Sequence, residues 1–123
     1  MGLFDITQTV LERALSGSAL RQTVPANNIA NANTANYKRS DVDFQSTLAQ
    51  ALDGPGATDS PSQISNLEFT PQTDASATVR ADGNSVDMDA EMAKLSENSV
   101  NYQALISIAH ARLQILQTAI SSR

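Results

Sequence analysis

Residues 87–120 read DMDAEMAKLSENSVNYQALISIAHARLQILQTAI, a run with neither Gly nor Pro. Steps of alternately four and three residues from Met88 reach ten positions, and nine of them are apolar, as in the seam of a coiled coil. The ten positions are Met88, Met92, Leu95, Ser99, Tyr102, Ile106, Ala109, Leu113, Leu116 and Ile120. Asp87 is a favourable N-cap, and Asp89 and Glu91 suit the positive end of the helix dipole. The pattern predicts one long helix with a continuous seam.

The N-terminal segment has a second helical pattern, from residue 3 to about residue 30. One half of its helical wheel is apolar and the other half is polar. The apolar half consists of Leu3, Phe4, Ile6, Val10, Leu11, Ala14 and Leu15. Gly17 costs roughly 1 kcal/mol of helix propensity relative to Ala, and Pro25 removes a backbone donor. We therefore expect a bend at Pro25, with the helix resuming through Ile29.

The middle of the chain is polar and rich in turn-forming residues. The Asn-rich residues 31–41 should end the first helix, and residues 42–52 place Phe44, Leu48 and Leu52 on one face of a short amphipathic segment. Residues 53–85 are interrupted by the breaker Gly54-Pro55-Gly56 and by Pro61, Pro71 and Gly83. They carry −4 of the net charge of −5. The alternation from residue 64 to residue 70 predicts a short strand, which needs a pairing partner and could take it from another chain.

These segments predict an all-α fold in which two long terminal helices form a coiled-coil-like pair, joined by an irregular middle segment with at most a short strand. Both termini would form one structural domain. Residues 1–52 would hold the N-terminal helix, the Asn-rich turn and the short amphipathic segment, residues 53–85 a flexible acidic loop region, and residues 86–123 the C-terminal coiled-coil helix.

The pair of helices is marginal on its own and should need neighbours. A buried seam side chain contributes roughly 2 kcal/mol, whereas ordering each helical residue costs roughly 1–2 kcal/mol. Four apolar residues off the seam offer further surface, and they indicate contacts on more than one side of the helix. These residues are Val100, Leu105, Ile108 and Ile115.

Composition argues against several classes of function. The eight basic residues are scattered, which does not suit nucleic acid. There is no cysteine, and the single histidine, His110, has no accompanying set of titratable residues, so we expect no catalytic residues, no cofactor and no enzyme activity. Residues 82–89 lack the spacing of a calcium loop, and no metal site is expected. The apolar runs are too short for a cleaved signal or for direct membrane insertion.

Two stretches carry a resemblance to a known family. Residues 26–39 read ANNIANANTANYKR and continue to DVDF at 41–44, which resembles the signature of bacterial flagellar axial proteins, Ala-Asn-x-x-Asn-x-x-Thr-Pro-Gly-Tyr. Residues 82–91 and 98–104 look most like the proximal members of the flagellar basal-body rod protein family. The usual Thr-Pro-Gly-Tyr is here Thr34-Ala35-Asn36-Tyr37, in which Asn36 has to supply the positive φ of the turn.

The resemblance implies a structural rod subunit that stacks helically through its terminal helices and helps transmit torque across the periplasm. It also implies export through the flagellar type III apparatus without a cleaved signal. The implied partners are the chain itself, other rod subunits, a membrane-ring protein and a small adaptor at the rod base. Another axial rod protein of the same family, or a coiled-coil adaptor or export-associated binding module, is the alternative. A small metal-dependent enzyme is a distant third.

The row of Asn residues has two readings, a polar helix end or an assembly interface. Side-chain amides both donate and accept, so they can fix the register between subunits without net charge. Together with the resemblance, this predicts an assembly interface that combines the Asn-rich turn with the C-terminal seam. Its predicted residues are Asn27, Asn28, Asn31, Asn33, Asn36, Tyr37, Phe44, Met88, Met92, Leu95, Tyr102, Ile106, Leu113, Leu116 and Ile120.

Overall fold

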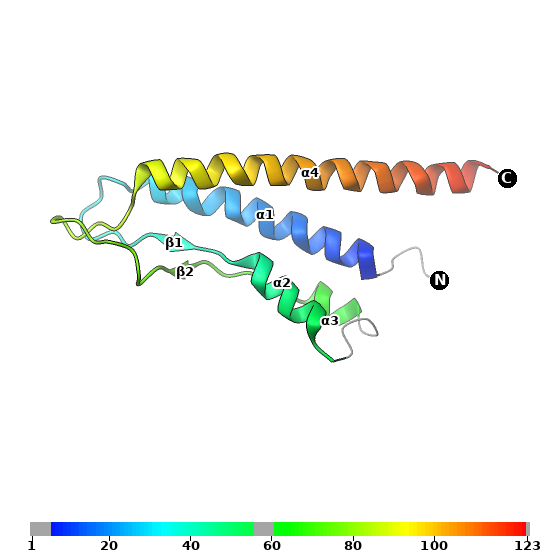
Figure 1. Ribbon diagram of the computed structural model, residues 1–123, viewed down its shortest axis with the longest axis horizontal. Helices are drawn as coiled ribbons and strands as arrows, with labels where there is room; N and C mark the ends of the chain where they lie inside the picture. The colour runs from blue at the N-terminus through cyan, green and yellow to red at the C-terminus, as the bar shows by residue number, and fades with distance from the viewer. Residues whose placement is uncertain (1–5, 56–60, 123) are drawn as a thin grey trace.

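The computed structural model describes residues 6–55 and 61–122 (Figure 1). In chain order the elements are α1 (Ile6–Ala30), β1 (Ser40–Asp41), α2 (Phe44–Asp53), α3 (Pro61–Ser65), β2 (Gln72–Thr73) and α4 (Met88–Ser121). The long helices α1 and α4 lie side by side and run in opposite directions, and α1 also contacts α2, α3 and β1. The predicted, mostly helical fold with two long terminal helices is therefore confirmed. Leu3 and Phe4 of the predicted apolar face lie outside the described residues.

The predicted strand lies in a different place and has a different partner. Residues 61–65 form α3, which begins at Pro61, a favourable first helical residue. The strand β2 follows later, and it pairs antiparallel with β1 of the same chain, Ser40 opposite Thr73 and Asp41 opposite Gln72. The alternating apolar residues were a misleading signal because they are packing contacts: Ile64 is fully buried, and the Phe69 ring meets that of Phe44 edge-on at 5.8 Å.

The apolar core is small, as the low aromatic content of 4% predicts. It gathers where α2 and α3 pack against α1, with further members in the connecting segments. Its buried apolar side chains are Leu11, Val24, Ala32, Val42, Phe44, Leu48, Ile64 and Val86. None of the described α4 residues belongs to this set, because its apolar residues are at most half-buried and its two buried residues, Glu91 and Asn98, are polar.

The face of α4 that α1 covers is offset from the predicted seam. Its buried and half-buried positions again include steps of four and three, but every second one precedes the predicted residue. These positions are Glu91, Leu95, Asn98, Tyr102, Leu105, Ala109, Arg112 and Leu116, and Lys94, Ser99 and Ile106 are half-buried as well. Four residues of the predicted seam are instead 45–67% exposed, namely Met88, Met92, Leu113 and Ile120. Within the subunit, the covered face therefore takes in six of the ten predicted seam residues and adds a row that lies one residue earlier, from Glu91 to Arg112.

Polar pairing explains this register. Asn98 lies between the two long helices, where its Nδ2 donates to the Ser18 carbonyl at 2.9 Å and to Gln22 Oε1 at 2.7 Å. The Ser18 hydroxyl donates to Asn98 Oδ1 at 3.0 Å. Both Ser18 and Asn98 are buried, so each hydrogen bond replaces contact with water that burial removes. Matched amides and a hydroxyl thus form the fully buried part of the helix contact, beside apolar side chains that are only half-buried.

Gly17 and Pro25, the two residues of α1 with the lowest helix propensity, are both buried. Pro25 lies inside a helix that continues to Ala30, so the predicted resumption of the helix is confirmed. Gly17 faces the first residue of α2, and a Cβ at this position would come within 2.5 Å of the Phe44 ring. The missing side chain at Gly17 is what lets α2 approach α1.

Replacing Gly17 by Ala is expected to destabilise the protein. Alanine gains roughly 1 kcal/mol of helix propensity, but overpacking costs 1–3 kcal/mol, and the clash involves Phe44 atoms close to the backbone. We expect a lower Tm in circular dichroism melts, with a net loss of roughly 1 kcal/mol. The double variant Gly17→Ala/Phe44→Leu should lose less than the sum of its two single variants. A Tm for Gly17→Ala at or above wild type would contradict the tight packing.

Candidate functional site: a polar cluster and the outer face of α4

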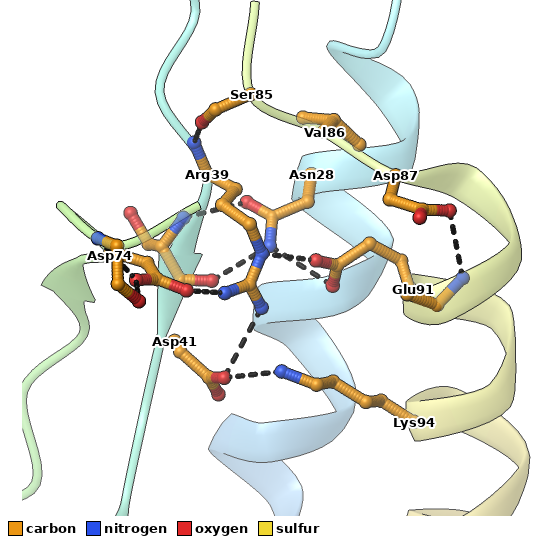
Figure 2. A network of polar contacts seen from close by, with 12 residues as sticks. Asn28, Arg39, Asp41, Asp74, Ser85, Val86, Asp87, Glu91 and Lys94 are labelled. Carbon is orange, nitrogen blue, oxygen red and sulfur yellow. Dashed lines mark hydrogen bonds and ion pairs between the residues drawn. The ribbon is translucent and has the colours of Figure 1, made fainter. Parts of the chain in front are cut away.

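A polar cluster joins the N-terminal and C-terminal halves of the fold (Figure 2). We define it as Asn28, Arg39, Asp41, Asp74, Ser85, Glu91 and Lys94. Its members come from α1, β1, the segments that flank the strands, and the first two turns of α4. The cluster therefore connects parts of the chain that are distant in sequence.

Arg39 is the centre of the cluster, and its residue is only 6% exposed. Its Nε donates to Glu91 Oε1 at 2.5 Å, Nη2 to Asp41 Oδ2 at 3.1 Å, and Nη1 to Asp74. The planar guanidinium suits this role because its donors diverge in fixed directions toward several carboxylates. The backbone N–H of Arg39 also donates to the Ser85 hydroxyl at 2.9 Å, which fixes the segment before α4.

Asn28 uses its whole side-chain hydrogen-bonding capacity inside the subunit. Its Nδ2 donates to the Ser40 carbonyl at 2.7 Å and to Glu91 Oε2 at 3.1 Å. Its Oδ1 accepts from the Ser40 N–H at 3.0 Å and from the Tyr37 hydroxyl at 3.2 Å. Since Asn28 is fully buried, it serves the fold and is covered before any neighbour arrives.

The cluster sets the protonation of its charged members. Burial works to raise the pKa of Asp41, but hydrogen bonds from Lys94 and Arg39 outweigh it and hold that pKa below its usual value. Burial likewise works to lower the pKa of Arg39, and hydrogen bonds to Glu91 and Asp41 raise it overall. The Ser76 hydroxyl and backbone N–H depress the pKa of Asp74. The cation and these two carboxylates are therefore charged at neutral pH.

Acidification should weaken the fold through Asp41. A carboxyl with a depressed folded pKa contributes stability above its unfolded pKa, about 3.9, and loses it as pH falls through the folded value. We expect Tm to fall steeply below about pH 4. Asp41→Asn should be less stable than wild type at pH 7 but should lose less Tm on acidification. Parallel pH profiles for Asp41→Asn and wild type would show that Asp41 contributes nothing.

A second set of contacts closes the Asn-rich turn onto the segment before α4. Asn84 is fully buried, and its Nδ2 donates to the Asn31 carbonyl at 2.9 Å and the Thr34 carbonyl at 2.8 Å. The Asn36 N–H donates to the Asp82 carbonyl at 2.9 Å. Asn36 has φ +61°, so the predicted positive φ in the turn is confirmed. These contacts give residues 82–84 a structural role.

The structure separates the predicted interface residues into three groups. Those buried within the subunit are Asn28 and Phe44. Those half-buried are Asn31, Tyr37, Leu95, Tyr102, Ile106 and Leu116. Those exposed are Asn27, Asn33, Asn36, Met88, Met92, Leu113 and Ile120.

Sequence reasoning missed the roles of Arg39, Glu91 and Asn98. Arg39 was read as one of several scattered basic residues, and Glu91 as a partner of the helix dipole. Both interpretations use local features, whereas the side chains of Arg39 and Glu91 have most of their partners far along the chain. One signal was available. A seam drawn one residue earlier contains Glu91 and Asn98, and polar residues at such positions indicate paired polar contacts inside the subunit.

Comparison with known proteins agrees with this architecture. Residues 9–38, which cover most of α1 and the Asn-rich turn, match the family described as flagella basal body rod protein. This match indicates the class of protein, a structural subunit of the bacterial flagellar rod. The chain is 37% identical to the flagellar basal body rod protein FlgB of Bacillus subtilis (strain 168), with 98% of both chains aligned. It is 34% identical to FlgB of Escherichia coli (strain K12), over 90% of both chains.

A third relative, FlgB of Borrelia hermsii, is 31% identical over 88% of this chain and 90% of the relative. The chain belongs to the FlgB family of flagellar basal-body rod proteins. It is a structural subunit of the proximal rod. Among residues 6–55 and 61–122, no helix is both long and apolar enough to span a bilayer.

Proposed function

We propose that this subunit builds the rod through the outer face of α4 and the exposed end of its Asn-rich turn, stacking helically and helping to transmit torque across the periplasm. The observation that carries the proposal is the apolar surface that α1 leaves uncovered on α4. Met88, Met92, Val100, Ile108, Leu113, Ile115 and Ile120 are each at least 45% exposed. So many large apolar side chains along one helix are typical of a surface that partners cover.

In this proposal, the exposed part of the predicted coiled-coil-like seam forms contacts between subunits. The positions that the chain itself leaves open, such as Met92 and Leu113, would pack against helices of neighbouring subunits. The internal positions Glu91 and Asn98 would hold α4 straight against α1 while those neighbours bind. An axial column of such helices can bear torsion because packed interiors deform little.

The proposal includes the partners and location implied by the resemblance. Neighbours would be copies of this chain and other rod subunits, with the membrane-ring protein and a small adaptor at the rod base. The subunit would reach the periplasm through the flagellar type III apparatus without loss of a cleaved signal.

The direct test uses a strain that lacks its own copy of the gene. The full chain with an epitope tag should restore swimming and appear in purified basal bodies, within the rod. A tagged chain that restores swimming but remains in a discrete soluble complex would favour an adaptor or export-associated module over a rod subunit.

Met92→Glu is expected to abolish swimming in the complemented strain. The residue is 55% exposed, so the added charge leaves the isolated fold intact but would be buried against a neighbour. Gln50→Glu adds the same charge to an exposed position of α2, outside the proposed surface, and serves as the matched control. We expect equal Tm values for both purified variants. Normal swimming with Met92→Glu would show that Met92 is not part of the interface.

A further inference from the structure

The chain contains two Asp-Gly pairs, at residues 53–54 and 82–83, and no Asn-Gly pair. Glycine after aspartate matters because it has no Cβ to keep its backbone nitrogen away from the aspartate side chain. That nitrogen can attack the neutral side-chain carboxyl, and a five-membered imide forms with loss of water. The two pairs are therefore the places where the backbone is most open to this rearrangement, and the fold decides which of them can reach the reactive geometry.

The rearrangement needs no co-reactant except water. In the first step the glycine N–H bond and the carboxyl C–OH bond break, the proton and the hydroxide leave as water, and the nitrogen bonds to Cγ. Water then reopens the imide at either of its carbonyls. Opening at Cγ restores aspartate, whereas opening at the backbone carbonyl gives isoaspartate, in which the main chain runs through Cβ and Cγ. Each reopening places an oxygen atom of water in the product carboxylate, so the event can be traced.

The pair Asp82–Gly83 is held in a closed turn. The Gly83 N–H, which would have to attack, donates to the Arg80 carbonyl at 2.9 Å. Asp82 Oδ1 accepts from the Asn84 N–H at 3.0 Å, and the Asp82 carbonyl accepts from the Asn36 N–H at 2.9 Å. The hydrogen bond from the Asn84 N–H holds the pKa of Asp82 below its usual value, which leaves little of the neutral carboxyl that the reaction needs.

The fold requires glycine at position 83. Gly83 has φ +79°, and a Cβ there would overlap the side-chain oxygen of Asn36. The Gly83 carbonyl also accepts from Lys38 Nζ at 2.6 Å, which ties this turn to the Asn-rich turn. An isoaspartate at Asp82 would lengthen the backbone inside these contacts and separate them. A reactive pair is thus unavoidable here, and hydrogen bonds enclose it.

The pair Asp53–Gly54 lies at the exposed end of α2. Asp53 is the last residue of the helix, and Gly54 has extended backbone with φ −69° and ψ 149°. The Asp53 side chain is exposed, and its carboxylate has no hydrogen bond or ion pair to residues 6–55 or 61–122. Because helix ends fray at almost no cost in free energy, rotation of one terminal residue brings this carboxyl to the Gly54 nitrogen.

We propose that Asp53–Gly54 is a site of spontaneous isoaspartate formation in the folded subunit, whereas the turn of residues 80–84 keeps Asp82–Gly83 unreactive. The difference belongs to the free folded chain, so it does not depend on assembly into a rod.

The test is incubation of the purified full chain at neutral pH in water enriched in heavy oxygen, followed by digestion in ordinary water and mass spectrometry of the peptides. We expect label and isoaspartate to accumulate at Asp53 about tenfold faster than at Asp82, because local opening of a hydrogen-bonded turn is a minor state. In guanidinium chloride, which unfolds the chain, both pairs should react at similar rates.

Asp53→Glu is the matched control, because glutamate would have to form a larger ring. It should lose the signal at position 53 and leave the rate at Asp82 unchanged. Equal labelling of the two pairs in the folded chain, or no label at Asp53, would overturn the proposal. So would a tenfold difference that persists in guanidinium chloride, because it would then come from neighbouring residues in the sequence and not from the fold.

Discussion

Replacing Arg39 by Met should lower the free energy of unfolding by about 3–5 kcal/mol, as expected when one partner of a buried ion pair is removed. The loss arises mainly at Glu91, whose side chain is 1% exposed and would be left buried without its cationic partner. Asp41 keeps the 2.5 Å ion pair with Lys94, and Asp74 keeps its hydrogen bonds from Ser76. Urea unfolding followed by circular dichroism measures the change.

The double variant Arg39→Met/Glu91→Gln is the matched control. Glutamine keeps the shape of Glu91 and an oxygen that can accept from Asn28, but it needs no cation. We therefore expect the double variant to recover most of the stability lost in Arg39→Met. A loss below about 1 kcal/mol in Arg39→Met, the scale of an exposed pair, would contradict the role given to the cluster. So would a double variant no more stable than the single one.

The local features of the fold were predictable because they depend on nearby residues. Asp87 caps α4 as expected, with its carboxylate accepting from the Ala90 N–H at 3.1 Å. Asn36 adopts the positive φ that the turn requires, and α1 continues past Pro25. In each case the determining interaction lies within a few residues, where backbone sterics and capping chemistry act in the same way in most proteins.

The register of α4 was not predictable from hydrophobicity alone. The most apolar stripe of a helix is normally assigned to the inside of its own subunit. Here Met92 and Leu113, near the two ends of the predicted seam, are exposed, whereas the polar residues Glu91 and Asn98 are buried beside half-buried members of the same seam. In a subunit made for assembly, exposed apolar residues can serve contacts between chains, while buried polar residues and half-buried apolar residues together hold α4 in the monomer. That division also explains why the apolar core of a single chain is so small.

The polar cluster was unpredictable for a related reason. Arg39 and Glu91 are 52 residues apart, and Asn28 and Glu91 are 63 apart. A row of Asn residues gives no sign of which one will be buried, because each has the same donors and acceptors. Only the arrangement of α1, β1 and α4 selects Asn28 for the interior and leaves Asn27 and Asn33 exposed. The Asn-rich signature therefore combines one residue that stabilises the fold, Asn28, with exposed residues that can contact neighbouring subunits, such as Asn27 and Asn33.

Asn28→Asp is the most specific test of this division, since it alters charge and donors without altering shape. The substitution removes both donors of Nδ2, and it places a second carboxylate beside Glu91 Oε2, 3.1 Å from the present amide nitrogen. The cluster already sets three carboxylates against the cations of Arg39 and Lys94, so no cation is free to neutralise a fourth. We expect a loss of roughly 3–5 kcal/mol at pH 7.

The pH dependence of this loss identifies its cause. Two adjoining carboxylates raise the folded pKa of the pair above the unfolded value of about 4. The penalty relative to wild type is therefore full above that raised pKa, and it shrinks as pH falls through it and one carboxyl becomes a donor again. Asn27→Asp, on the exposed side of the same helix end, should cost less than about 1 kcal/mol. A pH-independent penalty in Asn28→Asp would mean that lost shape, rather than the paired carboxylates, destabilises the fold.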